Sequence, residues 1–257
     1  NIISYLDYFK YIVIQTETQE VMEILGIDVG GTGIKAAIVN TETGELTSEK
    51  RRIKTPKSAT PEAVANKIQK LINHFNWTGI VGCGFPTPLQ HGKCLSGGNL
   101  HETWKGVLVN ELFKNKTGND FYIVNDADAA GLAEINFGAG KDKEGVVVMI
   151  TLGTGIGSAV FLDGKLLPNT EFGHVLHKSG IIFEKYTADS IRKREKLTRK
   201  KWGKRLHEYF KHINLLLSPD LFIIGGGGGK RIDEFEKRIK IATPMVAAEA
   251  ENEAGII

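Results

Sequence analysis

The chain has 257 residues, of which 41% are hydrophobic and 25% are charged, and its formal net charge is only +3. These values are ordinary for a soluble globular protein, and the balanced charge gives no reason to expect a nucleic-acid partner. Cys83 and Cys94 are too few for a disulfide framework and match no zinc module, which favours a reducing, cytoplasmic location. No apolar run is long enough to span a bilayer, so no membrane partner is expected.

Residues 1–21 precede the first strong strand and are interpreted as an N-terminal extension. Their apolar stretch contains Asp7 and Lys10, and it lacks the basic start and the small-residue cleavage site of a signal peptide. Met22 opens directly into the strand and would serve as a natural start. A native N-terminal helix is the alternative that composition leaves open.

The first half of the chain alternates predicted strands and helices. Apolar runs predict strands over residues 24–29, 34–39, 46–53, 79–85 and 120–124. A helix is expected after Thr60, which can cap it, and Pro61, which suits the first helical position, with apolar residues at helical spacing as far as Phe75. A second helix is predicted over residues 127–137.

The second half begins with strands over residues 145–152 and 158–162, followed by a hairpin turn at Asp163-Gly164. A basic helix then presents an apolar face from Trp202 to Leu217 and ends at Pro219. After a strand over residues 221–224, the five glycines Gly225–Gly229 are predicted to form a turn before another helix. This alternation predicts α/β layers in which helices cover a mixed sheet.

One sequence pattern occurs twice. Residues 30–39 read GGTGIKAAIV and residues 152–161 read LGTGIGSAVF, and in both places an apolar strand precedes the glycine turn and another follows it. Short glycine-rich strings match by chance fairly often, but here the flanking context matches as well. The pattern therefore favours a duplicated supersecondary unit.

The glycine turns are candidate phosphate sites. Plain hairpins also use glycine, but turns without side chains let phosphate oxygens approach backbone N–H groups closely. Asp28 ends its strand at the first turn, where a carboxylate can bind Mg²⁺ or its water shell. Neither the P-loop motif nor the dinucleotide motif is present. The candidate phosphate-binding residues are Asp28, Gly30, Gly31, Thr32, Gly33, Lys35, Gly153, Thr154, Gly155, Gly157, Gly225, Gly226 and Gly227.

An Asn-Asp-Ala-Asp string over residues 125–128 follows the predicted strand that ends at Val124. A carboxylate at such a junction can simply cap the helix, and Asp128 fits that interpretation well. Asp126 lies where open α/β sheets place their ligands, and there it can accept the proton of an attacking hydroxyl. The spacing leaves both roles open.

Four strings resemble the ROK family of sugar kinases and repressors: residues 28–35 (DVGGTGIK), 125–131 (NDADAAG), 153–158 (GTGIGS) and 171–174 (EFGH). That family has the actin/hexokinase-like (ribonuclease H-like) fold. The resemblance therefore implies two α/β domains beside a cleft, an N-terminal one over residues 22–126 and a C-terminal one over residues 127–257. Residues 167–174 (LPNTEFGH) and 219–227 (PDLFIIGGG) are similar to the polyphosphate-dependent glucokinases of the family.

The resemblance also implies roles for particular residues and partners. Asp126 matches the catalytic base, and the residues that match the sugar site are Gly84, Phe85, Pro86, Asn99, Asn125, Glu171 and His174. The implied reaction moves a phosphoryl group from polyphosphate, or ATP, to the 6-hydroxyl of glucose, with Mg²⁺ as the cofactor. Family likeness further favours a homodimer.

Three departures from the family pattern matter. No cysteine follows His174, whereas many members carry a cysteine-rich zinc loop there, so we expect no structural zinc. Thr87 occupies a position where relatives usually have glycine, which puts the shape of the sugar loop in question. The chain stops at Ile257, where relatives usually continue into a short helix.

Basic residues crowd the segment 192–205, in which Glu195 is the one acid. Such a run is usually a solvated helix face, but it can also form a track for a polyanion, with Lys193, Arg194, Lys200 and Lys201 as candidates. An ATP-only glucokinase or another hexose kinase is the nearest alternative function. A sugar-sensing repressor is less favoured, because too few residues precede the first strand for a DNA-binding domain.

Overall fold

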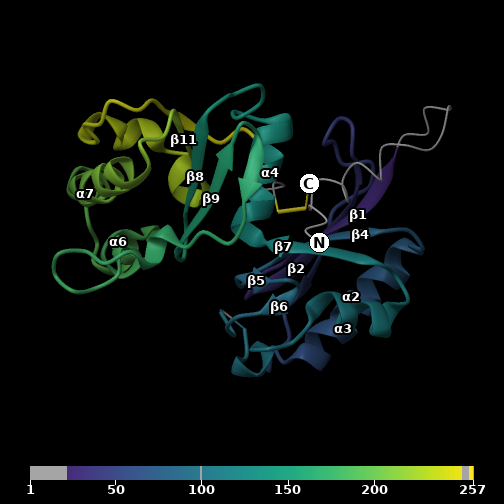
Figure 1. Ribbon diagram of the computed structural model, residues 1–257. Coiled ribbons are helices and arrows are strands. Elements are labelled where there is room, and N and C mark those ends of the chain that lie inside the picture. The colour runs from purple at the N-terminus through teal and green to yellow at the C-terminus, as the bar shows by residue number, and fades with distance from the viewer. Residues whose placement is uncertain (1–21, 99, 251–254, 257) are drawn as a thin grey trace, which may run out of the picture.

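The structure is a computed structural model that describes residues 22–98, 100–250 and 255–256. These residues form two lobes, each built on a five-stranded sheet (Figure 1). The first sheet has the order β3-β2-β1-β4-β7. Its strands are β1 (Glu23–Val29), β2 (Gly33–Asn40), β3 (Arg51–Lys54), β4 (Val81–Phe85) and β7 (Phe121–Asn125). The short strands β5 (Leu89–Gln90) and β6 (Lys93–Cys94) pair beside it, and α2 (Pro61–Phe75) and α3 (Val109–Thr117) cover one face.

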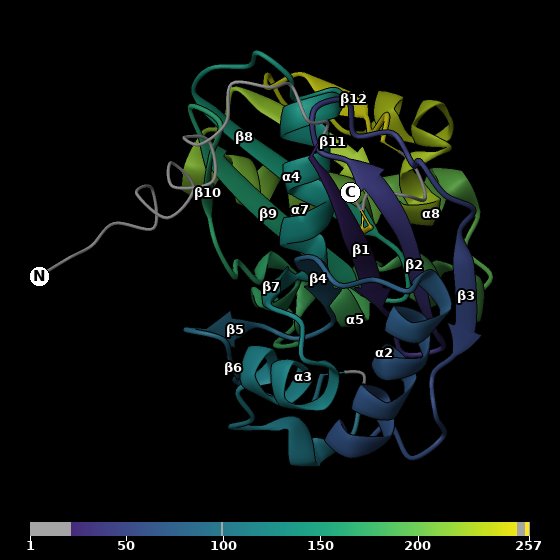
Figure 2. The same cartoon turned by 90° about the vertical axis from the view of Figure 1, so that its right-hand side faces the viewer.

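The second sheet has the order β10-β9-β8-β11-β12. Its strands are β8 (Val146–Leu152), β9 (Ile156–Leu162), β10 (Lys165–Leu167), β11 (Leu221–Gly225) and β12 (Met245–Ala247). The helices of this half are α4 (Asp126–Phe137), α5 (Phe183–Thr187), α6 (Asp189–Arg194), α7 (Arg199–Leu217) and α8 (Gly226–Gly229). In both views α4 lies between the two sheets, while α7 covers the outer face of the second sheet (Figure 1, Figure 2).

The two sheets share one topology. In each, the first strand in sequence pairs antiparallel with the next strand and parallel with a later one. In the first sheet β1 pairs in this way with β2 and β4, and in the second sheet β8 pairs with β9 and β11. The predicted duplication is therefore confirmed at the level of strand order and direction.

The strand register also aligns the repeated sequences. Ile34 pairs with Val29 in the first hairpin, and Ile156 pairs with Leu152 in the second. The Gly-Thr-Gly-Ile strings are thus equivalent, and Gly30 is an additional residue in the first turn. The same alignment makes the cross-strand pair Asp28–Lys35 equivalent to the pair Thr151–Gly157.

Each lobe has its own apolar core. In the first, Trp104 packs against Phe85 and Phe113, with ring centroids 4.8 and 6.2 Å away, and these two phenyl rings also contact each other. In the second, the predicted apolar face of α7 is buried against β8 and β11, with Trp202 and Phe210 fully buried. These cores hold the strand ends that carry the site.

Two predicted elements were wrong. The strand expected over residues 46–53 is reduced to β3, because the Ser48 hydroxyl accepts the Ile38 N–H at 2.8 Å in place of a backbone carbonyl. The five glycines are not a turn before a helix: Gly226–Gly229 form the short helix α8, and only the 3₁₀ turns Ile232–Glu234 and Glu236–Arg238 follow. Thr60 does precede α2, but its side chain makes no capping hydrogen bond.

The proposed division at residues 126 and 127 falls in the first turn of α4 and stays a prediction. Ile256 packs against Ala37 and Val39 of β2, so the chain returns to the first sheet after completing the second. The N-terminal extension over residues 1–21 and Asn99 lie outside the described residues. No helix in the described part of the chain is long and apolar enough to cross a membrane.

Candidate active site

The candidate site begins where three parallel strands end. Asp28 of β1 is in register with Gly84 of β4, and Phe85 of β4 is in register with Asn125 of β7. The carboxyl ends of these strands therefore meet at one edge of the first sheet, with Asp126 directly beyond β7. A Cβ on Gly84 would lie 3.8 Å from the Asp126 Cα, so the sheet edge and the first turn of α4 are in close contact.

Asn125 is the residue that caps α4. Its Oδ1 accepts hydrogen bonds from the N–H groups of Ala127 at 2.9 Å and Asp128 at 3.4 Å. The expectation that Asp128 caps this helix was therefore wrong, because the residue before the helix supplies the acceptor.

Asp128 instead faces the second lobe. Its Oδ2 accepts the backbone N–H of Asn169 at 2.8 Å, while its Oδ1 is buried without a partner. Burial, together with the charges of Asp126 and Glu171, raises the pKa of Asp128 to about 6, although the Asn169 hydrogen bond opposes that rise.

Asp126 lies in an acidic setting. Its pKa is raised to about 6, chiefly by loss of hydration, even though the residue keeps exposed surface. The nearby charges of Asp28 and Glu171 contribute to this rise, and a hydrogen bond from the Ala127 N–H opposes it. Asp28 and Glu171 thus both lie within electrostatic reach of Asp126. A carboxylate with this pKa is suited to accept a proton near neutral pH.

Glu171 and His174 flank a 3₁₀ turn of the second lobe. His174 Nδ1 lies 3.2 Å from Glu171 Oε2. Burial raises the pKa of Glu171, while the His174 contact works in the opposite direction. Ser158 holds this turn, because its hydroxyl donates to Thr170 O at 2.7 Å and accepts the Phe172 N–H at 3.0 Å.

The predicted sugar loop, Gly84-Phe85-Pro86, continues β4. Thr87 bends the chain back, with its N–H donating to Phe85 O at 2.9 Å. Its side chain is 1% exposed and its hydroxyl donates to Cys94 Sγ at 3.4 Å. A threonine is therefore accommodated at this position by packing against Cys94.

The first glycine turn is flanked by a charged pair. Lys35 Nζ lies 2.8 Å from Asp28 Oδ2. The turn is closed by a hydrogen bond from Gly30 N to Gly33 O at 3.0 Å, which leaves Gly31 and Thr32 exposed at its tip. Backbone and charge are thus both presented at the end of β1.

The second glycine turn is held from behind by residues that the sequence did not indicate. Glu184 accepts the Ile156 N–H at 2.9 Å. Ser190, in the first turn of α6, donates through its N–H to Gly153 O at 3.1 Å and through its hydroxyl to Thr154 O at 2.6 Å. These contacts orient the turn and join it to α6.

Two glycines place the second turn beside its neighbours. A Cβ on Gly157 would lie 2.9 Å from the Cβ of Ala127, so this hairpin touches the helix that carries Asp126. Gly226 has φ +71° and a Cβ there would lie 2.8 Å from Leu152 O. Gly225–Gly227 therefore lie next to the Gly153–Gly157 turn, as a joint phosphate site requires.

The cations of the basic segment differ in their exposure to solvent and in their acidic partners. Buried Asp189 is contacted by Arg192 and by Lys193 Nζ at 2.7 Å, and Arg199 Nε lies 2.9 Å from Glu234. The four candidates for the polyphosphate track, Lys193, Arg194, Lys200 and Lys201, are all exposed. Because Ser190 in the first turn of α6 bonds Gly153 and Thr154, the basic segment starts beside the second glycine turn.

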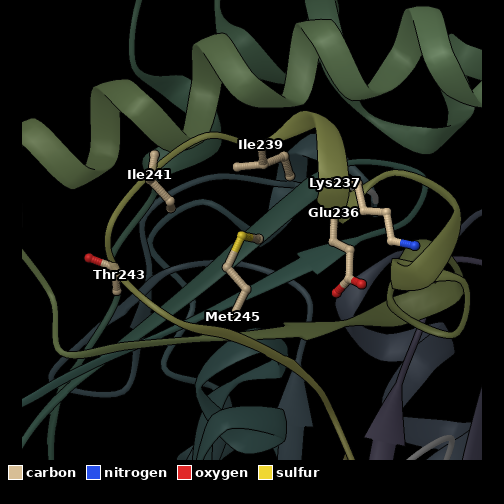
Figure 3. A pocket seen from close by; sticks show the side chains of 6 residues that line it. All are labelled: Glu236, Lys237, Ile239, Ile241, Thr243 and Met245. Carbon is tan, nitrogen blue, oxygen red and sulfur yellow. The ribbon is translucent and has the colours of Figure 1, made fainter.

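A hollow of about 260 Å³ lies elsewhere, between α7 and β12 (Figure 3). It is lined by Glu236, Lys237, Ile239, Ile241, Thr243 and Met245, none of which is a predicted site residue. Among the described residues no three His, Cys, Asp or Glu side chains gather closely enough to hold a metal ion by themselves.

Duplicated α/β lobes, paired glycine hairpins and a carboxylate at the strand ends define the class: a sugar kinase with the actin/hexokinase-like fold. The model of the ROK family matches residues 24–188, and the chain belongs to that family.

Relatives and solved structures agree with this assignment. The polyphosphate glucokinase of Mycobacterium tuberculosis is 42% identical over 233 residues, covering 90% of this chain and 88% of the relative. The inorganic polyphosphate/ATP-glucomannokinase of Arthrobacter sp. strain KM is 41% identical, with a TM-score of 0.86 and coverage of 91% of this chain and 95% of that one. A ROK glucokinase from Streptomyces griseus, solved with glucose and AMPPNP, shares the fold at 20% identity, with a TM-score of 0.78 and coverage of 91% and 97%.

Proposed function

We propose that this protein transfers a phosphoryl group from inorganic polyphosphate, and also from ATP, to the 6-hydroxyl of glucose. One observation carries the proposal: Asp126 stands at the joint edge of β1, β4 and β7, close enough to Asp28 and Glu171 for their charges to raise its pKa. The relatives named above supply the substrate class, since one is named for polyphosphate and glucose and the other also for ATP and mannose.

The proposed reaction has Asp126 as its base. Asp126 accepts the proton of the glucose 6-hydroxyl while that oxygen bonds to the terminal phosphorus of the donor. The bond from this phosphorus to its bridging oxygen breaks, and the shortened polyphosphate or ADP leaves. Asn125, Glu171 and His174, with the loop Gly84–Pro86 and Asn99, hold the sugar hydroxyls, because amide, carboxylate and imidazole groups offer paired donors and acceptors.

The glycine turns of both lobes bind the donor phosphates through backbone N–H groups. Mg²⁺ would neutralise phosphate charge during transfer. Asp28 is the carboxylate that fits such an ion, and because no cluster of ligands surrounds it in the described residues, the donor phosphates and water must supply the remaining oxygens. This fits an ion that arrives with its substrate.

The exposed cations of the basic segment extend the donor site for a polymer. Ser190 fixes the start of α6 to Gly153 and Thr154, so a chain of phosphates that leaves the second turn meets Lys193, Arg194, Lys200 and Lys201 next. ATP presents fewer charges than a long polyphosphate and should gain less from these cations.

The proposal is tested by a coupled assay for glucose 6-phosphate with polyphosphate and ATP as separate donors. Asp126→Asn should lower turnover about 10²–10⁴-fold with either donor, while its circular dichroism spectrum stays that of the wild type. Production of glucose 6-phosphate from ATP alone would assign the chain to the ATP-only alternative, and mannose in place of glucose tests the breadth of the sugar site.

Assembly and location complete the proposal. We expect a homodimer, as the family resemblance implies, which light scattering of the purified protein measures. Cys83 and Cys94 are buried free thiols, which fits the reducing cytoplasm predicted from composition. Zinc analysis after chelation should find no bound metal.

A further inference from the structure

Asn169 makes contacts that no sequence pattern indicated. It lies between β10 and the Glu171–His174 turn, in the second lobe, with φ +61°. Its side chain bonds both backbone groups of Leu89 in the first lobe: Oδ1 accepts the Leu89 N–H at 2.8 Å, and Nδ2 donates to Leu89 O at 2.7 Å. The side-chain amide of Asn169 thus bonds both backbone groups of a strand residue, as a neighbouring strand would, and these two bonds link the two lobes.

The partners of Asn169 adjoin segments of the candidate site. Leu89 is 6% exposed and continues the loop that starts with Gly84-Phe85-Pro86. The Asn169 N–H donates to Asp128, which lies two residues after Asp126 in the first turn of α4. The next residue, Thr170, is fixed by Ser158 through its carbonyl oxygen, and Glu171 follows directly.

We propose that Asn169 is a positioning residue that fixes the Glu171–His174 turn of one lobe against the Gly84–Pro86 loop of the other. It thereby assembles the two halves of the sugar site before glucose binds. This inference rests on the proposed function, since it assigns those two segments to the sugar. Preorganisation of this kind strengthens binding because the two segments lose less conformational entropy when the ligand binds.

The chemistry of this position requires asparagine. A left-handed backbone is accessible to Asn, Asp and Gly with little strain. Among these three only Asn offers both an acceptor for the Leu89 N–H and a donor for the Leu89 carbonyl. Asp keeps the acceptor but places a carboxylate beside that carbonyl, and Gly keeps only the backbone.

The test compares Asn169→Gly and Asn169→Asp with Asn76→Gly as the matched control. Asn76 also has a left-handed backbone, φ +47°, but it is exposed at the end of α2 and lies outside the site. Losing two side-chain hydrogen bonds should raise the KM for glucose about 10-fold or more in Asn169→Gly. The KM for polyphosphate and kcat should change by less than about 2-fold, because Asn169 touches neither the glycine turns nor the Asp126 carboxyl.

A second measurement reads the contact without any substrate. Hydrogen exchange of the Leu89 amide should accelerate in Asn169→Gly, which removes its acceptor, and remain unchanged in Asn76→Gly. Faster Leu89 exchange with an unchanged glucose KM would overturn the positioning role, as would equal losses for glucose and polyphosphate. Unchanged Leu89 exchange would overturn the contact itself. Absence of glucose phosphorylation by the wild type would instead refute the proposed function, and the exchange experiment would still decide whether Asn169 joins the lobes.

Discussion

Asp126 and Asp128 are separated by one residue, and the pKa of each is raised to about 6, but they face different surroundings. Asp126 keeps exposed surface at the strand ends, whereas Asp128 is 1% exposed and bonded to Asn169. The first is placed to exchange a proton with a substrate, and the second has no access to one. Their titrations should therefore show in different measurements.

For Asp126 the measurement is the pH dependence of kcat/KM for glucose. The base works only when deprotonated, so kcat/KM should fall about 10-fold per pH unit below pH 6 and level off above it. In Asp126→Asn the same limb should vanish along with most of the activity. A wild-type profile that is flat from pH 5 to pH 8 would contradict the assignment.

For Asp128 the measurement is the free energy of unfolding. Its pKa is higher in the folded state than in the unfolded chain, so folding takes up a proton between about pH 4 and pH 6, and its contribution to stability is lost as pH rises through 6. Asp128→Asn keeps an acceptor for the Asn169 N–H and removes this loss. We expect it to stabilise the protein by about 1–3 kcal/mol at pH 7.5 and by little at pH 4 in urea titrations. Asp163→Asn, at an exposed site, controls for the change of charge, and a stability gain that is larger at pH 4 would refute the assignment.

At the scale of single residues, the sequence identified the candidate site residues better than the side chains that support them. Asp126, Glu171 and His174 lie in short strings that could be recognised, and the structure brings Asp126 and Glu171 within electrostatic reach. The supporting contacts of Ser190 and Asn169 could not be predicted, because they join residues 36 and 80 positions apart. Single polar residues carry no periodicity that would reveal such pairs.

Among the elements, long amphipathic ones were predicted well and short ones were not. The buried face of α7 follows from helical spacing alone. Strand β12 and helix α8 are too short to show any period, and β3 was overestimated because a serine hydroxyl replaces a ladder hydrogen bond. Local side-chain competition of this kind is invisible to a pattern of apolar residues.

The basic segment provides the prediction at the level of elements. Changing Lys193, Arg194, Lys200 and Lys201 together to Gln should raise the KM for long polyphosphate roughly 10-fold at low salt and flatten its salt dependence, because fewer counterions are released on binding. The KM for ATP should stay within about 2-fold of the wild type. Arg192 and Arg199 are left intact because they are largely buried and pair with Asp189 and Glu234. Lys193 also contacts Asp189, but its side chain is 68% exposed.

A control with the same loss of charge changes Lys70, Lys116, Lys141 and Lys143, which are exposed and outside the segment. If the two quadruple variants behave alike, or if ATP and polyphosphate are affected equally, the segment is a solvated face.

The molecule is built on two sheets of the same topology, and the chain passes from the first lobe to the second and then returns to the first. The α/β class was predicted from the alternation of elements, the actin/hexokinase-like fold from the family resemblance, and the duplication from the repeated motif. The return of the chain to the first lobe was not predicted. Ile256 is 4% exposed and packs on Ala37 and Val39, although it follows the second lobe in sequence. The first lobe therefore draws part of its core from the far end of the chain.

This return predicts a stability effect. Ile256→Ala should lower the free energy of unfolding by about 2 kcal/mol, since a buried aliphatic side chain is removed. Leu215→Ala is the control, because Leu215 is 79% exposed and its truncation should cost no more than about 0.5 kcal/mol. Equal effects of the two substitutions in denaturant titrations would show that Ile256 is not part of the core.

The two hydrogen bonds from Ser190 to the second glycine turn have a thermodynamic consequence. They join the turn to the start of α6, so in the proposed donor site a polymer that binds the cations of α6 would also restrict the turn that holds the reacting phosphate. Such coupling is reciprocal: a terminal phosphate bound in the turn would raise the affinity of α6 for the distant part of the polymer by the same factor. Chain length would then be sensed as cooperativity between the two ends of the donor site, in addition to the affinity that extra contacts provide.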